Sequence, residues 1–162
     1  MRGAISVGDV YIDDIVVFGN AFTEAYKGES ELARDPRIVL TNSATERVKG
    51  HLKYYAENFQ APQNLQLYID SDGQWFLNYL ENLMEAVNEI GPPFAELEQH
   101  KQMIEQRLSE FRSSPEFWNK YFWAANYHNF FCSQYPEHFN ESHMINLEKL
   151  QLRPSRVIKE IP

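Results

Sequence analysis

The sequence predicts an α+β fold, with a sheet and its helices in the first half and a pair of long helices in the second. Strand-like runs of Val and Ile alternate with amphipathic segments up to about residue 80, after which helical spacing dominates. The chain has 162 residues, about one domain's worth, of which 43% are hydrophobic and 14% aromatic. This composition is enough to bury a core. We therefore expect a sheet part over residues 1–80 and a helical part over residues 81–162.

The first strands are expected to form a hairpin. Ile5 and Val7 alternate with smaller residues, which is the period-two pattern of a strand with one face in a core. Asp13 and Asp14 predict a two-residue turn, because Asp tolerates positive φ better than most residues. Residues 15–18 are apolar at every position, which predicts a second strand buried on both faces.

A helix over residues 20–32 is expected next. Its amphipathic pattern places Phe22, Ala25 and Tyr26 toward the interior. Residues 37–41 then predict a third strand, because an apolar run follows an Asp-Pro boundary.

The sheet part ends with one more helix and a last pair of segments. Residues 43–57 predict a helix capped by Ser43, with Glu46 at the spacing of a capping box. Residues 65–69 predict a fourth strand, and residues 75–77 are either its partner strand or the start of a helix.

The second half predicts an antiparallel helix hairpin. Residues 94–112 carry apolar side chains at helical spacing, and Ser114, Pro115 and Glu116 are a strong signal for the start of the next helix. That second helix, which runs to about residue 132, is full of aromatic rings. They are most simply core, but a lone helix pair cannot cover them all. Some are therefore expected to bury against the sheet part or a second chain.

Charge and cysteine content exclude some partners. The net charge is -8 and the pI is about 5.1, with about -4 on each half, so a nucleic-acid backbone would be repelled. No apolar run reaches the roughly 18 residues of a membrane span, so no membrane partner is expected. The single cysteine, Cys132, excludes an internal disulfide and fits a cytoplasmic chain.

Several segments near the start together carry a resemblance to a known family. They are Arg-Gly-Ala-Ile-Ser-Val-Gly at residues 2–8, Phe18-Gly19, and Phe22-Thr23-x-Ala25-x-Lys27-x-Glu29. This combination resembles the second half of a class III nucleotidyl (adenylate/guanylate) cyclase catalytic domain, closest to a bacterial group with a shortened hairpin. The likeness covers residues 2–45, and more loosely extends to residue 75. It implies a partial, ferredoxin-like cyclase sheet, followed by a helical extension.

The resemblance also implies a reaction and a site. Such cyclases form a cyclic nucleotide from a nucleoside triphosphate, and a complete enzyme uses Mg²⁺ or Mn²⁺ to activate the hydroxyl and neutralise the phosphates. On this basis Thr23 would contact the ribose and Lys27 the phosphate, as candidate catalytic residues. Val16, Phe18 and Gly19 would be substrate-binding positions. The family's sites lie at a dimer interface, so the expected partner is a second copy or the upstream half of the same protein.

The candidate residues depart from the family pattern. Thr23 stands where the family has asparagine, so its hydroxyl reaches less far toward a ribose. Lys27 stands where the family has arginine, and it keeps the cation but loses the planar fork that binds phosphate in two places. Val16 occupies a position that often reads the base, and it cannot do so by hydrogen bonding. A solvent-facing helix pair is an equally good interpretation of Thr23 and Lys27.

The metal-binding half of the family pattern is absent from this sequence. In the family both metal-binding aspartates precede the arginine-glycine strand, which here follows Met1 directly. Asp9, Asp13 and Asp14 lie after that strand and are poor replacements. We therefore expect no metal site in this chain, no activity of the chain alone, and a longer protein of which this is the C-terminal portion.

Two other functions stay open. One is a degenerate, non-catalytic cyclase-homology module that binds a nucleotide or a protein partner, and the other is a structural interaction domain built on the aromatic helices. Among smaller motifs, the Asp-Ser-Asp-Gly run at residues 70–73 predicts a plain turn rather than a calcium loop. His128 is expected to be buried and hydrogen-bonded, and Cys132 to be a packed thiol.

Overall fold

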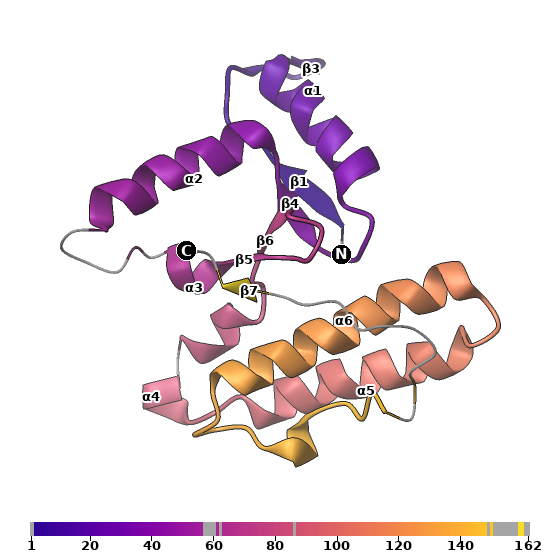
Figure 1. Ribbon diagram of the computed structural model, residues 1–162. Helices are drawn as coiled ribbons and strands as arrows, with labels where there is room; N and C mark the ends of the chain where they lie inside the picture. The colour runs from indigo at the N-terminus through magenta and orange to yellow at the C-terminus, as the bar shows by residue number, and fades with distance from the viewer. Residues whose placement is uncertain are drawn as a thin grey trace. The chain divides into compact units, whose positions relative to one another are not determined.

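The chain forms two compact units (Figure 1). The computed structural model describes residues 2–56, 61, 63–85, 87–148, 150 and 159–160. The sheet unit comprises residues 1–78 and 159–162, and the helical unit comprises residues 79–158. Helices combine with one small mixed sheet, which confirms the mixture of helix and strand predicted from the sequence.

The sheet unit is built on a five-stranded mixed sheet with the order β1-β4-β6-β5-β7. Its neighbouring strands β1 and β4 are parallel, and every other neighbouring pair is antiparallel. A separate antiparallel hairpin joins β2 and β3. The strands are β1 (Gly3–Ile5), β2 (Tyr11–Ile12), β3 (Val17–Phe18), β4 (Ile38–Leu40), β5 (Leu67–Ile69), β6 (Trp75–Leu77) and β7 (Lys159–Glu160). The helices of the unit are α1 (Asn20–Lys27), the π-helix η1 (Gly28–Leu32), α2 (Asn42–Tyr55) and α3 (Gln63–Gln66).

One face of this sheet packs against α2. Leu40, Leu67 and Trp75 form a buried apolar cluster with Ala44 of α2, and Val48 packs against it one turn later. The strands predicted at residues 37–41 and 65–69 are therefore present as β4 and β5. Residues 75–77, expected to be either a partner strand or the start of a helix, form the partner strand β6. Residues 63–66, just before β5, form the short helix α3.

The start of α2 differs from the predicted capping box. The helix begins at Asn42 after Thr41, which caps it without a side-chain hydrogen bond. The Ser43 N–H and hydroxyl instead donate to the carboxylate of Glu24 on α1, at 3.1 and 2.5 Å. Glu46 forms an ion pair with Lys49. A carboxylate from a neighbouring helix thus satisfies the donors that the local box was expected to satisfy.

Small residues face inward from α1 and η1. Of the three positions predicted to face the interior, Ala25 is half-buried, but the two aromatic residues are exposed. Ala21 and Gly28 are buried, whereas Phe22 is half exposed and Tyr26 is 67% exposed. A Cβ on Gly28 would lie 2.7 Å from Ala4 Cβ and 2.9 Å from Thr41 Cγ2. Ala4 pairs with Val39 and so lies on the sheet face opposite Leu40. The helices therefore approach this face too closely for large side chains.

This close approach gives a stability prediction with a matched control. Replacing Gly28 by Ala should destabilise the sheet unit by about 1–3 kcal/mol, because the neighbouring side chains leave no room for the methyl group. Gly50 in α2 has no atom within 4 Å of such a Cβ, so Gly50→Ala should stabilise by up to about 1 kcal/mol. Urea unfolding followed by circular dichroism measures both. Equal effects of the two substitutions would contradict close packing at Gly28.

The β2–β3 hairpin is exposed, which corrects the prediction of a strand buried on both faces. Ile15 is 92% exposed and Phe18 is 56% exposed. The connection between the strands has four residues, 13–16, rather than the predicted two. Within it the Asp13 N–H donates to the Val16 carbonyl at 3.0 Å. The Asp13 carboxylate accepts from the N–H groups of Ile15 and Val16, both at 2.8 Å. This side chain holds the four-residue connection, so positive φ at Asp13 or Asp14 is not needed.

The apolar residues at the end of β1 and just after it are also more exposed than predicted. Ile5 and Val7, expected in the core, are 40% and 48% exposed. The parallel pairing places Ile5 opposite Leu40, at the margin of the sheet and beyond the cluster covered by α2. An alternating pattern identifies a face, but it does not show that another layer covers that face.

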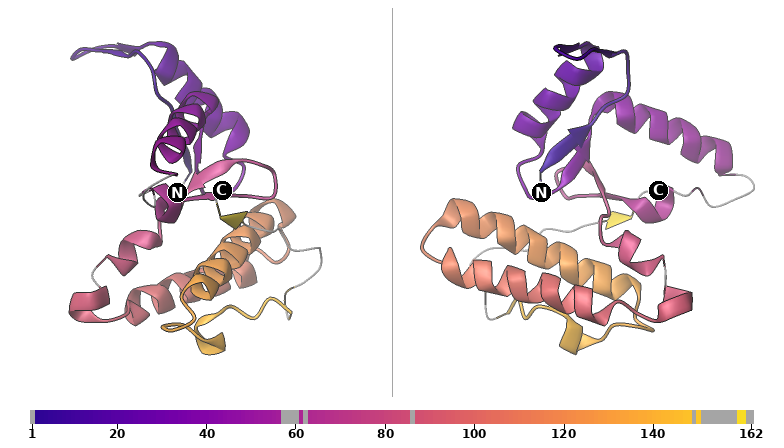
Figure 2. Two further views of the ribbon diagram at one scale, coloured as in Figure 1. Left: turned by 60° about the vertical axis from the view of Figure 1, so that its left-hand side comes forward. Right: turned by 180° about the vertical axis from the view of Figure 1, so that it is seen from behind.

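The helical unit is an antiparallel pair of long helices with shorter segments around it (Figure 2). Its elements are η2 (Glu81–Met84), α4 (Val87–Ile90), α5 (Phe94–Glu110), α6 (Pro115–Gln134) and η3 (Glu141–His143). Pro115 occupies the first turn of α6, as predicted. Lys101 of α5 donates from its Nζ to the Ser142 carbonyl at 2.7 Å. No helix among the described residues is both long and apolar enough to cross a membrane.

Candidate functional site

The predicted site residues gather on the hairpin and α1, but they do not share one cavity. Phe18 and Gly19 line a hollow of about 460 Å³. Val16 closes the connection between β2 and β3, while Thr23 and Lys27 lie one turn apart on α1. None of these last three residues lines the hollow. Its lining residues are Asp9, Val10, Tyr11, Phe18, Gly19 and Asn20.

Gly19 has a clear structural reason at this joint. Its φ of 143° lies in the region that favours glycine, and a Cβ there would be 2.4 Å from the Asp9 carbonyl oxygen. The same Cβ would lie 2.9 Å from Val10 Cα. Because both obstacles are backbone atoms, the Phe-Gly pair allows β3 to turn directly into α1 against the segment that leads to β2.

The two candidate catalytic side chains are placed differently. The Thr23 hydroxyl lies 3.2 Å from the Gly19 carbonyl, to which the Thr23 N–H also donates. The hydroxyl therefore bonds to its own helix rather than pointing to a ligand. Lys27 is exposed at the end of α1, and no ion pair involves it among the described residues. Lys27 thus keeps an accessible cation.

The Asp13 carboxylate is engaged within the turn of the hairpin. Asp13 accepts hydrogen bonds from two backbone N–H groups and from the Tyr11 hydroxyl, and these bonds lower the pKa of its carboxyl. Its oxygens are therefore used within the turn. Within the described part of the chain, no three His, Cys, Asp or Glu side chains gather as metal ligands would.

The dominant feature of the region is exposed apolar surface. We call these side chains the hairpin–helix surface; they come from β1, the hairpin, α1 and the segments between them, and Figure 1 shows where β1, the hairpin and α1 lie. Every member is at least 40% exposed. A run of large exposed apolar side chains is unusual on a monomer and typically marks an interaction site. The members are Ile5, Val7, Val10, Tyr11, Ile12, Ile15, Val16, Val17, Phe18, Phe22 and Tyr26.

A buried charge cluster lies in the sheet unit, and the sequence patterns missed it. Arg37 is fully buried and forms ion pairs with Asp70 and Asp72. The turn predicted at residues 70–73 is confirmed, since the Gly73 N–H donates to the Asp70 carbonyl at 2.9 Å. The signal for the cluster was an arginine at the start of a buried strand, which needs a buried partner. Its carboxylates are held by this arginine, so it is a structural feature.

A chain of hydrogen bonds crosses the helical unit through two histidines. The Tyr79 hydroxyl lies 3.0 Å from His100 Nε2, and His100 Nδ1 lies 3.0 Å from His128 Nδ1. His128 Nε2 in turn lies 2.9 Å from the His143 carbonyl oxygen. The prediction that His128 is buried and hydrogen-bonded is therefore confirmed. Cys132 is also buried, and burial raises the pKa of its thiol to about 11, as expected for a packed and unreactive cysteine.

The aromatic stripe of α6 is largely buried in this chain. Phe117 is an exception, at 48% exposed. The stripe therefore presents little free apolar surface, and an interaction domain built on it gains no support. The buried rings of the stripe are Trp118, Phe122, Trp123, Tyr127 and Phe131.

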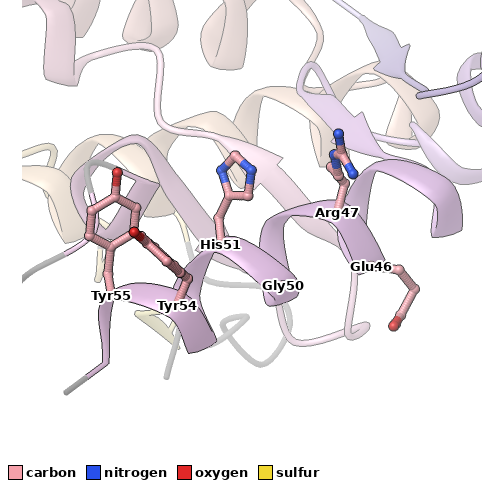
Figure 3. A pocket seen from close by; sticks show the side chains of 6 residues that line it. All are labelled: Glu46, Arg47, Gly50, His51, Tyr54 and Tyr55. Carbon is pink, nitrogen blue, oxygen red and sulfur yellow. The ribbon is translucent and has the colours of Figure 1, made fainter.

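A further hollow, of about 520 Å³, lies along α2 (Figure 3). All six lining residues come from successive turns of this one helix, and Arg47 and His51 point to the side opposite Glu46. No second element among the described residues contributes to its lining, so the hollow is a shallow strip of helix surface rather than an enclosed site.

Comparison with known proteins found no relative: no family model, no curated protein and no solved structure matches the chain. We therefore infer the function from the residues and contacts described above.

Proposed function

We propose that the sheet unit is a degenerate cyclase-homology module that acts by binding another protein, and that it does not turn over a nucleotide by itself. The observation that carries the proposal is the hairpin–helix surface, whose apolar side chains are concentrated within residues 5–26. A partner that covers this surface would remove large apolar areas from water, which is the main favourable term in most protein association.

The structure of the hairpin supports a binding role. Each strand has only two residues, β2 from Tyr11 and β3 from Val17, and such a short isolated hairpin has little stability of its own. Contact between the Tyr11 and Phe18 rings, with centroids 4.9 Å apart, and the Asp13 turn hold it in shape. An apolar element kept in shape but left uncovered is suited to contact with another chain.

The order of elements in the sheet unit supports the resemblance to cyclase domains on which this proposal draws. A strand, a hairpin, a helix and a second strand follow one another, and β1 and β4 are parallel neighbours. We therefore propose that this sheet is part of a ferredoxin-like fold. The bond from the Thr23 hydroxyl to its own helix supports the non-catalytic form of the module. A reducing, cytoplasmic location suits the single buried thiol.

The second candidate function is the C-terminal portion of an active nucleotidyl cyclase, which forms a cyclic nucleotide when complete. It is favoured by the hollow beside Phe18 and Gly19 and by the accessible cation of Lys27. In that case Thr23 would have to release its helix to reach a ribose. The metal ligands would not come from the carboxylates described above.

Site-specific photo-crosslinking in the cells that produce the protein tests the proposal. A benzoylphenylalanine at Phe18 should give a defined adduct with another protein, whereas the same group at Tyr54, an exposed aromatic position on α2, should not. Mass spectrometry identifies the adduct. Equal adducts at both positions, or none at Phe18, would contradict a binding role. Cyclic nucleotide formation by the purified chain with Mn²⁺ and ATP or GTP would favour the enzyme instead.

A further inference from the structure

The outer edge of the sheet is open at β1. The Gly3 N–H donates to the Arg37 carbonyl at 3.3 Å, and the Ile5 carbonyl accepts from the Thr41 N–H at 2.9 Å. Residues 3 and 5 therefore bond toward β4, and by the alternation of a parallel ladder the N–H and C=O of Ala4 point away from it. Among the described strands, β1 is the last in the order, with no neighbour on this side.

This edge carries neither charge nor proline, two of the features that protect edge strands against pairing. Natural edge strands are blunted by charged side chains, proline, bulges or a covering helix. Residues 3–7 are Gly, Ala, Ile, Ser and Val, with no charge and no proline. The side chains of Ile5 and Val7 are exposed beside it. An open, uncharged edge next to apolar surface is a template for an added strand.

The charge around the edge indicates what kind of strand fits. Residues 2–32 carry six acidic and two basic side chains, a net charge of -4. One of the two bases, Arg2, is already paired with Glu29 at 2.5 Å. A second copy would bring the same acidic surface against itself, and the acidic hairpin tip at Asp13 and Asp14 opposes contact with anionic lipid. A strand flanked by lysine or arginine would complement this charge.

We propose that β1 accepts an extended, apolar β-strand with basic flanks from a partner polypeptide, which pairs along Ala4 and packs on the hairpin–helix surface. This inference rests on the proposed binding function and adds the mode of binding and the chemistry of the partner. The backbone of Ala4 supplies the hydrogen bonds, and Asp9 and Asp14, both exposed, supply the charge preference.

Synthetic peptides test the inference on the full chain. The probe is a fluorescein-labelled Lys-Lys-Val-Thr-Val-Thr-Val-Lys-Lys peptide, and the controls carry glutamate in place of lysine or proline at the central valine. Fluorescence anisotropy should show binding of the basic peptide, and binding at least about tenfold weaker for both controls. Slower hydrogen exchange of the Ala4 amide on peptide binding should locate the contact.

Two variants separate the edge from the surface. Ala4→Pro removes the outward N–H, so it should weaken the basic peptide at least about tenfold. Its thermal unfolding is compared with that of the wild-type chain, because Ala4 packs closely against Gly28. The double change Asp9→Lys and Asp14→Lys leaves the edge intact and should reverse the preference to the glutamate peptide. Because the charge reversal does not touch the backbone, it remains informative if Ala4→Pro fails to fold.

Each opposing result has a definite meaning. No peptide binding, or equal binding by the Ala4→Pro chain, overturns strand addition. If crosslinking at Phe18 still yields an adduct in that case, the proposed binding function stands without this mode. A dimer in sedimentation velocity that Ala4→Pro converts to a monomer assigns the edge to a second copy and overturns the basic partner. Cosedimentation with phosphatidylcholine–phosphatidylglycerol vesicles assigns the surface to a membrane and likewise overturns it.

Discussion

Replacing Arg37 by methionine should destabilise the sheet unit by about 3–5 kcal/mol, the range for removing one partner of a buried ion pair. The Arg37 and Asp70 side chains are both fully buried, and Asp72 is only partly exposed. Methionine has a similar volume, so the substitution leaves little empty space. The loss comes instead from the Asp70 carboxylate, which would remain buried without the guanidinium.

A double substitution separates charge from packing at this cluster. Asp70→Asn keeps an oxygen that accepts from the Ser71 N–H, now 2.6 Å from Asp70 Oδ1, and it removes the charge. Arg37→Met combined with Asp70→Asn should therefore recover most of the stability lost by Arg37→Met alone. The stability of Arg37→Lys should lie between those of the wild-type chain and Arg37→Met. The lysine keeps a positive charge, but its ammonium group lacks the planar fork with which a guanidinium binds two carboxylates.

Native-state hydrogen exchange measures the effect in the correct unit. The amides of Val39 in β4 and Phe76 in β6, both fully buried, report on the sheet unit. The amide of Tyr127 in α6 reports on the helical unit and serves as an internal control. Faster exchange at Val39 and Phe76 with Tyr127 unchanged is the expected result. Stability lost equally by the single and double variants would show that packing, rather than charge, dominates.

The sequence predicted the elements better than their faces. β4 and the helix pair α5 and α6 lie close to their predicted ranges, because apolar runs and the Ser-Pro-Glu signal are local features. The prediction that Phe22 and Tyr26 of α1 face inward was wrong. The hydrophobic pattern favours large apolar side chains on the inner face, whereas the close packing of α1 and η1 on the sheet needs small ones. Gly28 lies close in space to Ala4 and Thr41, which are distant from it in the sequence. A local hydrophobic pattern carries no information about such contacts.

The candidate site shows the same division between local and distant information. The Phe-Gly joint was identifiable, and Gly19 does occupy a backbone conformation that requires glycine. Periodicity could not show whether other residues cover residues 15–18. A strand buried on both faces and an exposed apolar hairpin have the same sequence pattern, a continuous apolar run. The Arg37 cluster and the His100–His128 contact join residues 33 and 28 positions apart, which spacing arguments do not reach.

Acidification should destabilise the helical unit through its histidine pair. One arrangement of neutral rings satisfies every bond: His128 Nε2–H donates to the His143 carbonyl, His100 Nδ1–H donates to His128 Nδ1, and the Tyr79 hydroxyl donates to His100 Nε2. A first added proton must be buried with its charge. A second would place two N–H groups face to face between the rings, where His100 Nδ1 and His128 Nδ1 are 3.0 Å apart.

The direction of the pH effect follows from the lowered pKa values. Burial, and then the neighbouring His128, lower the pKa of His100 to about 4, and burial also lowers that of His128. An unfolded chain binds these protons near pH 6.5, so below that pH the unfolded state holds more protons than the folded state. The stabilising effect is therefore complete above about pH 6.5. It is lost progressively as the pH falls toward about 4, by about 2–3 kcal/mol for His100.

Variants of the pair identify which group causes the slope. Urea unfolding between pH 7.5 and 4.5, followed at the α6 amides, should show stability falling with acid in the wild-type chain and a clearly smaller slope in His100→Gln. Tyr79→Phe removes the hydroxyl at the end of the chain of bonds but keeps both histidines, so it should lower stability at every pH and retain the slope. If stability falls equally steeply with acid in His100→Gln, groups other than His100 cause the pH dependence. If the stability of the wild-type chain does not change with pH, the buried pair accepts a proton without destabilising the helical unit. Because the sheet unit contains neither histidine, its Val39 and Phe76 amides provide the control for a general effect of acid.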